Sequence, residues 1–526
     1  MAADLVHQLV ENAARAHPDK EAVVDGGRRF RYGDLADAVR ANAAALREHG
    51  LEPRDRVAVF LDRSFEETVG LLGAARAGGV FVPINGLLRP RQVLHILDDS
   101  GARFLVTSAR RAEILRDVLA AAGSLERILL VDHAPGPGWD RRVVSAAFRQ
   151  AHAASAPPAA SGEDLVAILY TSGSTGPPKG VMVSHRSLLA GSRIVCRYLG
   201  ITADERILCV LPLSFDYGLN QLITAVEKGA TTILLSFRFA DEIVRAIRAE
   251  RVTGLAGVPT LWVALTERAP SFRREKLSTL RYLTNSGGPV PTEMLDRVRR
   301  AQPHVDFFLM YGFTEAFRST YLPPAELARR PTSIGKAIPE TEVMLVNDQG
   351  ERCRPGEVGI LVHDGPTVTL GYWGKPEETA ALLRPHPFAA RPEGRPLVCY
   401  SGDRVKADAE GYLYFVGRDD GLIKSSGYRI GPSEVEEALM STGLLTQAAV
   451  FGLPDPVTGE RICAVCVAAG GGEADRHEIL TRCARELPQH MLPRDIEFVA
   501  ELPLSPNGKV DYQALRVARG AAADRP

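Results

Sequence analysis

Apolar and polar positions follow two patterns along the first 150 residues, one typical of buried strands and one typical of helices. Short apolar runs, "RVAVFLD", "VFVPIN", "ARFLVTS" and "RILLVD", predict buried strands. Between the first two runs, "SFEETVGLLGAARAGG" has the length and apolar spacing of a helix. Such strand–helix alternation predicts right-handed βαβ crossovers and a largely parallel sheet.

The alternation continues beyond "AHAASAPPAASGED", a stretch rich in Ala, Pro and Ser. The strand-like runs "TTILLSF", "GLAGVP" and "LRYLTNSGG" accompany the helix-like "EIVRAIRAERV". Because the same α/β pattern resumes on both sides, the Ala/Pro/Ser stretch is predicted to be a surface connection and not a domain boundary.

The pattern changes after "GYLYFVGRDDG". The segments "SEVEEALM", "QAAVFGLPD", "ICAVCVAAG", "HEILTRCARELP" and "DIEFVAELPL" predict a helix–strand–strand–helix–strand module of about a hundred residues. The polar junction around Asp420 is suited to a hinge. We therefore expect an α/β protein with two parts. Residues 1–417 form a large core of stacked, mostly parallel sheets with helices, and residues 418–526 form a small mobile α+β domain.

Composition excludes several function classes. A hydrophobic content of 45% and a charged content of 24% are ordinary for a soluble globular protein. The 63 Lys and Arg balance 64 Asp and Glu, which gives no support for a nucleic-acid or membrane-surface partner. The first residues lack the basic and apolar regions of a signal peptide, and no window approaches the ~18 apolar residues of a membrane span.

The seven cysteines are scattered and do not form a disulfide framework. Cys463 and Cys466 form a C-x-x-C inside a predicted strand, where residues three apart face opposite sides of the sheet. Two small core residues are therefore favoured over a metal site. This cysteine usage suits a reducing cytoplasm.

Candidate chemistry begins with "YTSGSTGPPKG", which follows an apolar strand. Its glycines and hydroxyl residues can direct backbone N–H and side-chain O–H groups at phosphate oxygens, with Lys179 as the counter-charge. It is not a Walker A loop, because two prolines separate Gly176 from the lysine. The predicted phosphate-binding residues are Thr171, Ser172, Gly173, Ser174, Thr175 and Gly176.

This stretch resembles the phosphate loop of the adenylate-forming (ANL) superfamily, which includes acyl-CoA synthetases, luciferases and nonribosomal peptide adenylation domains. Further motifs of that superfamily follow in order: "NSGGPVP", "YGFTE", "YSGD", "GRDDGLIKSSGYRIGPSEVE" and "PNGKVD". On these ordered motifs the chain is identified as a member.

The resemblance implies ATP and Mg²⁺ as cofactors and adenylation as the reaction, in which a carboxylate attacks the α-phosphorus of ATP and pyrophosphate leaves. Two anions must meet, so the site must neutralise charge. By resemblance, Lys509 would bridge the substrate carboxylate and the nucleotide, assisted by Lys179. Thr314 would bind the α-phosphate and Glu315 the Mg²⁺, a hard cation that takes oxygen ligands.

Other residues are assigned to the nucleotide and the thiol by the same resemblance. Asp403 would bind the ribose hydroxyls with Arg418 nearby, and Tyr311, Gly287 and Gly288 would flank the adenine. The chain departs from many members in having Leu309 where they have the Asn that binds the adenine amino group, so a backbone carbonyl would have to replace it. Asp420 matches the hinge about which the small domain rotates before thiol transfer. Gly427 would leave room for a pantetheine arm.

The acyl pocket carries the information on the substrate. The stretch "LPLSFDYGLNQ" places Asp216 where amino-acid adenylation domains keep an aspartate that pairs with the substrate ammonium. A buried carboxylate needs a cationic partner. By motif register, the residues around the acyl group are Asp216, Tyr217, Asn220, Thr284, Ser286, Met310, Arg318 and Ser319.

Two interpretations of Arg318 are open at this point. In one, Arg318 pairs with Asp216 or a neighbouring acid and the substrate is neutral. In the other, Asp216 binds an ammonium while Arg318, with Ser286, clamps a second carboxylate. The second interpretation predicts an acidic amino acid or β-amino acid, such as aspartate, methylaspartate or glutamate.

This combination is similar to stand-alone β-amino-acid adenylation enzymes of macrolactam polyketide pathways, which load a discrete acyl carrier protein. It is also similar to AMP-forming ligases of exosortase-linked gene clusters. A carrier protein is therefore the expected acceptor, and a coenzyme A ligase for a polar or dicarboxylic acid is the alternative. A non-catalytic nucleotide-binding regulator is disfavoured because Lys179, Glu315, Asp403 and Lys509 are all present.

Overall fold

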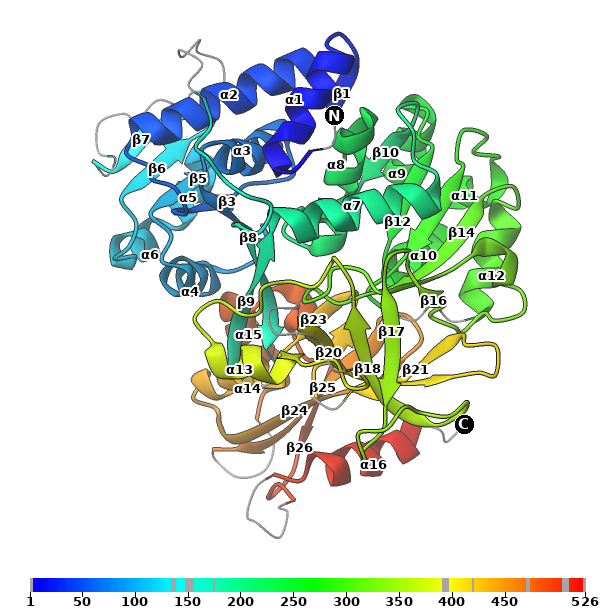
Figure 1. Cartoon of the computed structure of the whole chain (residues 1–526). Coiled ribbons are helices and arrows are strands. Elements are labelled where there is room, and N and C mark those ends of the chain that lie inside the picture. The colour runs from blue at the N-terminus through cyan, green and yellow to red at the C-terminus, as the bar shows by residue number, and fades with distance from the viewer. Residues whose placement is uncertain are drawn as a thin grey trace.

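The computed structural model describes residues 3–133, 139, 141–146, 156–173, 176–288, 290, 292–389, 397–418, 421–469, 474–503 and 510–523. In Figure 1 the C-terminal domain, coloured orange to red, lies beneath a larger blue-to-yellow body. The boundary predicted near Asp420 falls outside the described residues and stays a prediction.

The N-terminal third forms a seven-stranded sheet in the order β7-β6-β5-β3-β4-β8-β9. Every neighbouring pair is parallel except β8 and β9, which form an antiparallel hairpin around the predicted phosphate loop. The strands are β3 (Arg56–Phe60), β4 (Val80–Pro83), β5 (Phe104–Thr107), β6 (Arg127–Leu130), β7 (Val143–Ser145), β8 (Leu165–Gly173) and β9 (Gly176–Ser184).

A nine-stranded sheet follows in the order β16-β15-β14-β13-β12-β10-β11-β1-β2. Its six central strands are parallel, so their carboxyl ends meet at one edge, where α/β folds bind ligands. The strands are β1 (Glu21–Asp25), β2 (Arg28–Arg31), β10 (Arg206–Cys209), β11 (Thr231–Leu234), β12 (Gly254–Gly257), β13 (Tyr282–Asn285), β14 (Asp306–Tyr311), β15 (Thr320–Leu322) and β16 (Lys336–Ala337).

Residues 342–418 form an antiparallel sheet that the hydrophobic pattern did not separate from the rest of the core. Its order is β17-β18-β20-β19, with β21 also paired to β20. The strands are β17 (Glu342–Val346), β18 (Val358–Asp364), β19 (Leu383–Arg384), β20 (Val398–Ala407) and β21 (Leu413–Arg418).

The small domain has the predicted helix–strand–strand–helix–strand order, preceded by a hairpin of β22 and β23. Its sheet order is β23-β22-β25-β24, and β26 pairs in parallel with β25. The strands are β22 (Ile423–Ser425), β23 (Tyr428–Ile430), β24 (Leu445–Asp455), β25 (Gly459–Ala468) and β26 (Asp495–Phe498). The hairpin reaches back to the large body and carries the Gly427 motif.

Local sequence explains where the helices begin and end. For α7, the Ser184 hydroxyl accepts from the Ser187 N–H at the start, and Gly200 ends the helix at a φ of +62°. The helices are α1 (Val6–Ala16), α2 (Tyr32–Glu48), α3 (Phe65–Arg76), α4 (Pro90–Ser100), α5 (Ala109–Ile114), α6 (Arg116–Ala121), α7 (His185–Leu199), α8 (Asp216–Lys228), α9 (Ala240–Ala249), α10 (Pro259–Arg268), α11 (Pro270–Arg274), α12 (Thr292–Ala301), α13 (Pro376–Leu382), α14 (Pro432–Ser441), α15 (Arg476–Glu486) and α16 (Tyr512–Ala523).

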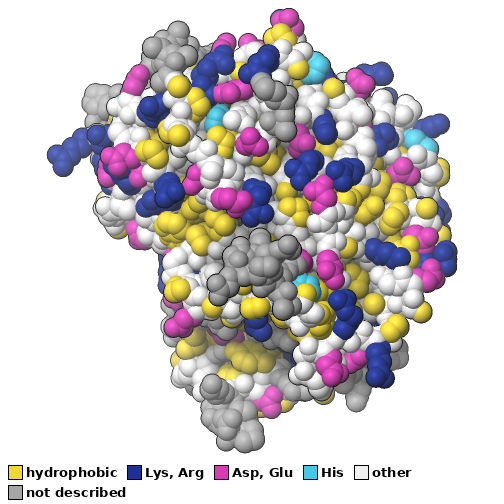
Figure 2. Space-filling view, in the orientation of Figure 1, with side chains coloured by type: hydrophobic (Ala, Val, Ile, Leu, Met, Phe, Trp, Pro, Cys, Tyr) yellow, Lys and Arg dark blue, Asp and Glu magenta, His cyan; other side chains and the backbone are white. Residues whose placement is uncertain are grey.

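Side-chain burial agrees with the sequence pattern. One extensive apolar cluster fills the large body and a separate one fills the small domain. Cys463 and Cys466 are buried in different clusters on opposite faces of β25, as predicted. In Figure 2, acidic and basic side chains are interspersed over the visible face. Among the helices of the described ranges, none has the length and apolar character needed to cross a bilayer.

Candidate active site

A cavity of about 410 Å³ lies between the large body and the small domain. Its walls come from the segments that follow the parallel strands β10, β13 and β14, together with the β22–β23 hairpin. The cavity therefore joins the predicted motifs, which are far apart in the sequence. The predicted site residues that line it are Thr171, Asp216, Ser286, Gly287, Gly288, Met310, Tyr311, Thr314, Arg318 and Gly427.

The β8–β9 hairpin brings the predicted phosphate-loop lysine to the rim of this site. Lys179 lies with its Nζ 5.5 Å from the centre of the Tyr372 ring and 4.0 Å from a Glu378 oxygen. Ser174 and Thr175 lie outside the described residues, as does the side chain of Ser172.

Glu315 is buried among donors from both domains. The Tyr372 hydroxyl donates to Oε1 at 2.7 Å, and Arg429 Nη1 of the hairpin lies 3.1 Å from Oε2. Burial and the adjacent Glu315 charge raise the pKa of the Tyr372 hydroxyl, which keeps it protonated as a donor. Glu315 does not line the cavity itself but directly follows Thr314, which does. A carboxylate in this position is the kind of ligand that fits Mg²⁺, which usually binds one or two carboxylates together with substrate phosphates.

Asp403 forms a second buried carboxylate site on β20. The Tyr311 hydroxyl donates to its Oδ2, and Lys424 Nζ lies 3.9 Å from the same atom. Arg418 is the cross-strand partner of Asp403 in the β20–β21 ladder, so the two predicted nucleotide residues are adjacent in the backbone. Lys509 lies outside the described residues, and its role stays a prediction.

Glycines let the hairpin approach the motif after β13. Gly287 and Gly427 have φ of +82° and +83°, in the left-handed region that favours glycine. A Cβ on Gly427 would lie 2.6 Å from Val258 Cγ1, and one on Gly287 would lie 3.4 Å from the Gly427 carbonyl oxygen. A side chain at Gly427 would therefore clash with Val258, whereas at Gly287 the backbone conformation, and not the space, favours glycine.

The end of the cavity that is predicted to bind the acyl group contains one buried carboxylate, Asp216, and one buried guanidinium, Arg318. Arg318 Nη1 lies 3.7 Å from Asp216 Oδ2, which is too long for a hydrogen bond. Arg318 Nε and Nη2 have no hydrogen-bond partner among the described residues, although the side chain is only 2% exposed. Burial raises the pKa of Asp216, and the Arg318 charge opposes that rise.

The loop after β14 fixes the position of Arg318. Phe317 is fully buried and adopts a φ of +59°, an uncommon conformation for a bulky residue. The Arg318 guanidinium carbon then lies 4.6 Å from the centre of the Tyr217 ring, within cation–π range. Ser319 continues the loop with its N–H donating to the Tyr311 carbonyl at 3.1 Å.

Comparison with known proteins assigns this arrangement to a family. A model of the AMP-binding enzyme family matches residues 10–373, and a model of the AMP-binding enzyme C-terminal domain matches residues 434–509. The chain belongs to the AMP-binding enzyme family. These enzymes are the adenylate-forming group that the motifs indicated, and this AMP-binding enzyme is an AMP-forming acid–thiol ligase that adenylates a carboxylic acid with ATP.

Its relatives include several kinds of ligase. Feruloyl-CoA synthase of Amycolatopsis sp is 35% identical over 501 residues, which are 94% of this chain and 95% of that one. Tyrocidine synthase 3 of Brevibacillus parabrevis is 30% identical over 515 residues, which are 97% of this chain and 8% of that longer protein. The structure of amide bond synthetase McbA from Marinactinospora thermotolerans matches with a TM-score of 0.85 and 26% identity, over 98% of this chain and 99% of that one.

Four predicted acyl-pocket residues of this AMP-binding enzyme do not border the cavity: Tyr217, Asn220, Thr284 and Ser319. The Tyr217 hydroxyl donates to the Thr284 carbonyl at 2.9 Å, and Ser319 Oγ lies 2.9 Å from His363 Nδ1. Asn220 is buried on the next turn of α8. The four residues therefore support the pocket wall in this structure, and direct contact with substrate stays a prediction.

Sequence reasoning missed the residues that the small domain and the antiparallel sheet contribute. Lys424, Tyr428, Arg429 and His490 border the cavity, while Tyr372 contacts Glu315 from behind it. Three of them lie inside the quoted "GRDDGLIKSSGYRIGPSEVE" motif, but neither periodicity nor spacing shows that their side chains turn toward the large domain.

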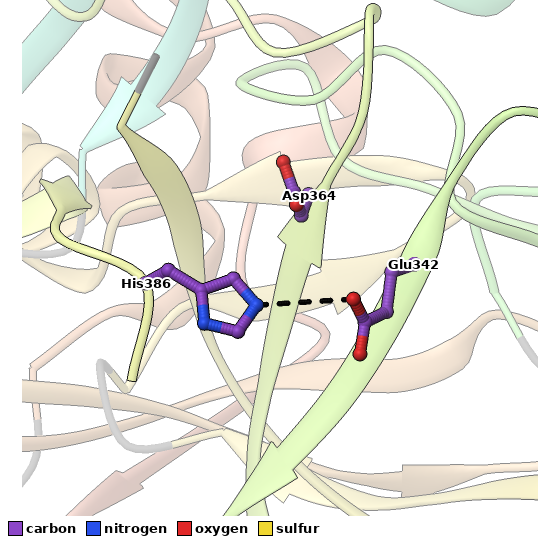
Figure 3. A group of neighbouring side chains, drawn as sticks. All are labelled: Glu342, Asp364 and His386. Carbon is purple, nitrogen blue, oxygen red and sulfur yellow. Dashed lines mark ion pairs between the residues drawn. The ribbon is translucent and has the colours of Figure 1, made fainter. Parts of the chain in front are cut away.

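A separate cluster of possible metal ligands, Glu342, Asp364 and His386, lies on and beside the antiparallel sheet. Figure 3 shows His386 and Glu342 pointing toward each other, with Nε2 and Oε2 3.8 Å apart. His386 Nδ1 accepts the Phe388 N–H at 3.1 Å, which places the proton of the neutral ring on Nε2. That nitrogen therefore faces Glu342 as a donor, and the geometry favours a polar pair over a metal centre.

Proposed function

We propose that this enzyme adenylates an acidic amino acid or β-amino acid and transfers it to the phosphopantetheine thiol of a separate acyl carrier protein. The observation that carries the substrate class is the incomplete pairing of Arg318. A buried guanidinium with two nitrogens lacking acceptors is costly unless a bound group completes its hydrogen bonds. A second carboxylate on the substrate would do so, and a guanidinium suits bidentate recognition of a carboxylate.

Asp216 provides a negative charge that could bind an ammonium group of the same substrate. At 3.7 Å the Asp216–Arg318 pair is loose enough for each member to take a substrate charge of opposite sign. A substrate with an ammonium group beside Asp216 and a carboxylate beside Arg318 leaves the pocket electrically balanced. A fatty acid would bury the pair without completing its hydrogen bonds.

In the first half-reaction, a substrate carboxylate oxygen forms a bond to the α-phosphorus of ATP, and the bond to pyrophosphate breaks. Mg²⁺ held at Glu315 would neutralise phosphate charge in that step. Thr171, Lys179 and Thr314 would position the phosphates, and Lys509 would bridge the two reacting anions. Asp403 and Tyr311 would hold the nucleoside.

In the second half-reaction, the thiol sulfur bonds to the acyl carbon and AMP leaves. The placement of Gly427 against Gly287 and the Val258 side chain supports the proposal that the pantetheine arm enters beside this glycine, because a side chain at position 427 would fill that space. Rotation of the small domain about the hinge near Asp420 would bring the hairpin into this place.

A coenzyme A ligase for a polar or dicarboxylic acid is the second candidate. It is favoured by the similarity to feruloyl-CoA synthase over nearly the whole length of both chains. The two candidates share the adenylation step and the Arg318 argument, and they differ in the thiol acceptor.

ATP–pyrophosphate exchange tests the substrate class, with a panel of α-amino, β-amino, dicarboxylic, aromatic and fatty acids. We expect aspartate-like and glutamate-like amino acids to give the highest kcat/KM. If neutral amino acids or simple fatty acids clearly exceed them, the proposed substrate class is wrong. The best acid is then offered with coenzyme A or with a phosphopantetheinylated carrier protein, and a carrier preference is expected.

A further inference from the structure

The first turn of α4 contacts the small domain at the wall of the cavity, because Gln92 and Glu434 both line it together with Thr171 of the predicted phosphate loop. Gln92 Nε2 donates to Glu434 Oε1 at 2.7 Å, which joins α4 of the large body to the first turn of α14. Two further contacts surround this bond. Arg89 Nε lies 3.4 Å from the Leu487 carbonyl oxygen, and the exposed Arg91 forms an ion pair with Glu437.

The start of α4 fixes the orientation of the Gln92 carboxamide. Gln92 Oε1 accepts the backbone N–H of Arg89 at 3.0 Å and so caps the helix. With its oxygen occupied in this way, the same carboxamide must direct its NH₂ group outward, toward Glu434. The hydrogen bond between the domains is therefore defined in both direction and polarity: the large body donates and the small domain accepts.

The Glu434 carboxylate has few other hydrogen-bond donors near it. Its Oε2 is buried and has no hydrogen-bond partner among the described residues. Burial raises the pKa of Glu434, and the bond from Gln92 opposes that rise. Loss of the Gln92 donor would leave a desolvated carboxylate at the domain interface, which is a costly arrangement.

Several contacts hold the small domain against the large body, including the Arg429–Glu315 ion pair. Two of them concern the position of the hairpin backbone: the approach of Gly427 to Val258 and Gly287, and the Gln92–Glu434 bond. Seven positions separate Gly427 from Glu434, and the short strand β23 connects them rigidly. A bond at Glu434 therefore determines where the Gly427 hairpin sits.

We propose that Gln92 is a positioning residue for the thiol-transfer half-reaction, because it selects the small-domain orientation that places the Gly427 hairpin at the cavity. This inference rests on the proposed function in assigning the hairpin to the thiol step. It concerns residues outside the phosphate loop, the acyl pocket and the hinge.

The test reverses the polarity of the bond. Gln92→Glu keeps an oxygen to cap α4 but opposes two carboxylates, whereas Gln92→Glu combined with Glu434→Gln restores one donor and one acceptor. Each variant is assayed at pH 7 and at about pH 8.5, because two facing carboxylates can share a proton and the higher pH weakens that sharing. Adenylation is followed by pyrophosphate exchange. Transfer is followed in a single turnover from preformed acyl-adenylate to pantetheine, the thiol arm common to both candidate acceptors.

We expect Gln92→Glu to slow transfer by about 10- to 100-fold by depopulating the competent orientation, while exchange stays near the wild-type rate. The double variant should recover most of the transfer rate. Arg91→Ala is the matched control, since it removes a solvent-exposed ion pair of the same interface and should change neither rate appreciably.

Three outcomes would overturn the inference: unchanged transfer in Gln92→Glu, equal losses in exchange and transfer, or no recovery in the double variant. Equal losses accompanied by a lower melting temperature would indicate a merely structural role. Failure of the proposed function is seen separately, as wild-type exchange that does not favour acidic amino acids.

Discussion

Buried charged side chains have different partners at the two ends of the cavity. At the predicted nucleotide end, Glu315 contacts Arg429 and Tyr372, and Asp403 contacts Tyr311 and Lys424 through Oδ2, so each carboxylate has protein donors. At the predicted acyl end, Arg318 lies 3.7 Å from the Asp216 carboxylate, and two of its nitrogens have no acceptor among the described residues.

This difference suggests that one end of the cavity serves the reaction common to the family, and that the other end determines which acid this enzyme accepts. The motif residues at the nucleotide end serve one reaction, adenylation, whatever acid is bound. The end predicted to bind the acyl group instead contains an unsatisfied donor, and under the proposed function a group of the substrate supplies its acceptor. Substitutions at the two ends should therefore differ in whether their effects depend on the acid offered.

The largest expected effect is at the nucleotide end. Glu315→Gln removes the charge that would hold Mg²⁺ but keeps an oxygen for the Tyr372 hydroxyl. We expect pyrophosphate exchange to fall by about 100- to 1000-fold, equally for acidic and neutral acids. Exchange is measured across a Mg²⁺ titration with both kinds of substrate. A loss confined to one substrate class would contradict the division between the two ends.

A smaller effect is expected where the small domain meets the cavity. Gly427→Ala would place a Cβ 2.6 Å from Val258 Cγ1, so we expect thiol transfer to slow by about 10-fold or more while exchange changes little. Gly443→Ala is the matched control, because Gly443 has a φ of +70° but nothing within 4 Å of an added Cβ. Equal losses in the two variants would mean that backbone strain, and not the close approach, is responsible.

The smallest effect should come from the support beneath Arg318. Tyr217→Leu removes the ring that stacks on the guanidinium, and we expect kcat/KM for an acidic amino acid to fall by about 3- to 10-fold. Tyr217→Phe keeps the ring and loses the hydroxyl contacts to the Thr284 carbonyl and to Thr284 Oγ1. Exchange kinetics of the two variants separate these contributions, and a larger loss in the phenylalanine variant would argue against the stacking role.

Much of the fold could be predicted from the sequence because its strands and helices differ in length and apolar spacing. The runs around Val57, Phe81, Leu105 and Ile128 became the parallel strands of one sheet. The antiparallel sheet of strands β17–β21 was missed as a unit because strands such as the ten-residue β20 alternate buried and half-buried residues instead of forming a continuous apolar run. The small domain was confirmed in its order of elements.

The candidate site was predictable where chemistry is concentrated in one motif. Thr314, Tyr311, Gly287 and Asp216 were assigned from such motifs, and the structure brings them to one cavity. Contacts such as Arg429 to Glu315 were not predictable, because they depend on how the small domain is oriented. The stacking of Arg318 on Tyr217 was not predictable for a different reason, because it accompanies an uncommon backbone conformation at Phe317.

The most direct test of the central claim is the ratio of kcat/KM values for an acidic and a neutral amino acid, measured by pyrophosphate exchange in the wild type and in Arg318→Ala. Because both values of each ratio come from one preparation, partial misfolding cancels. Loss of a charge-assisted clamp should cost the acidic substrate about 2–4 kcal/mol and the neutral one much less, so the ratio should fall sharply. An unchanged ratio would show that Arg318 is a structural partner of Asp216 and would contradict the claim that it recognises a second carboxylate.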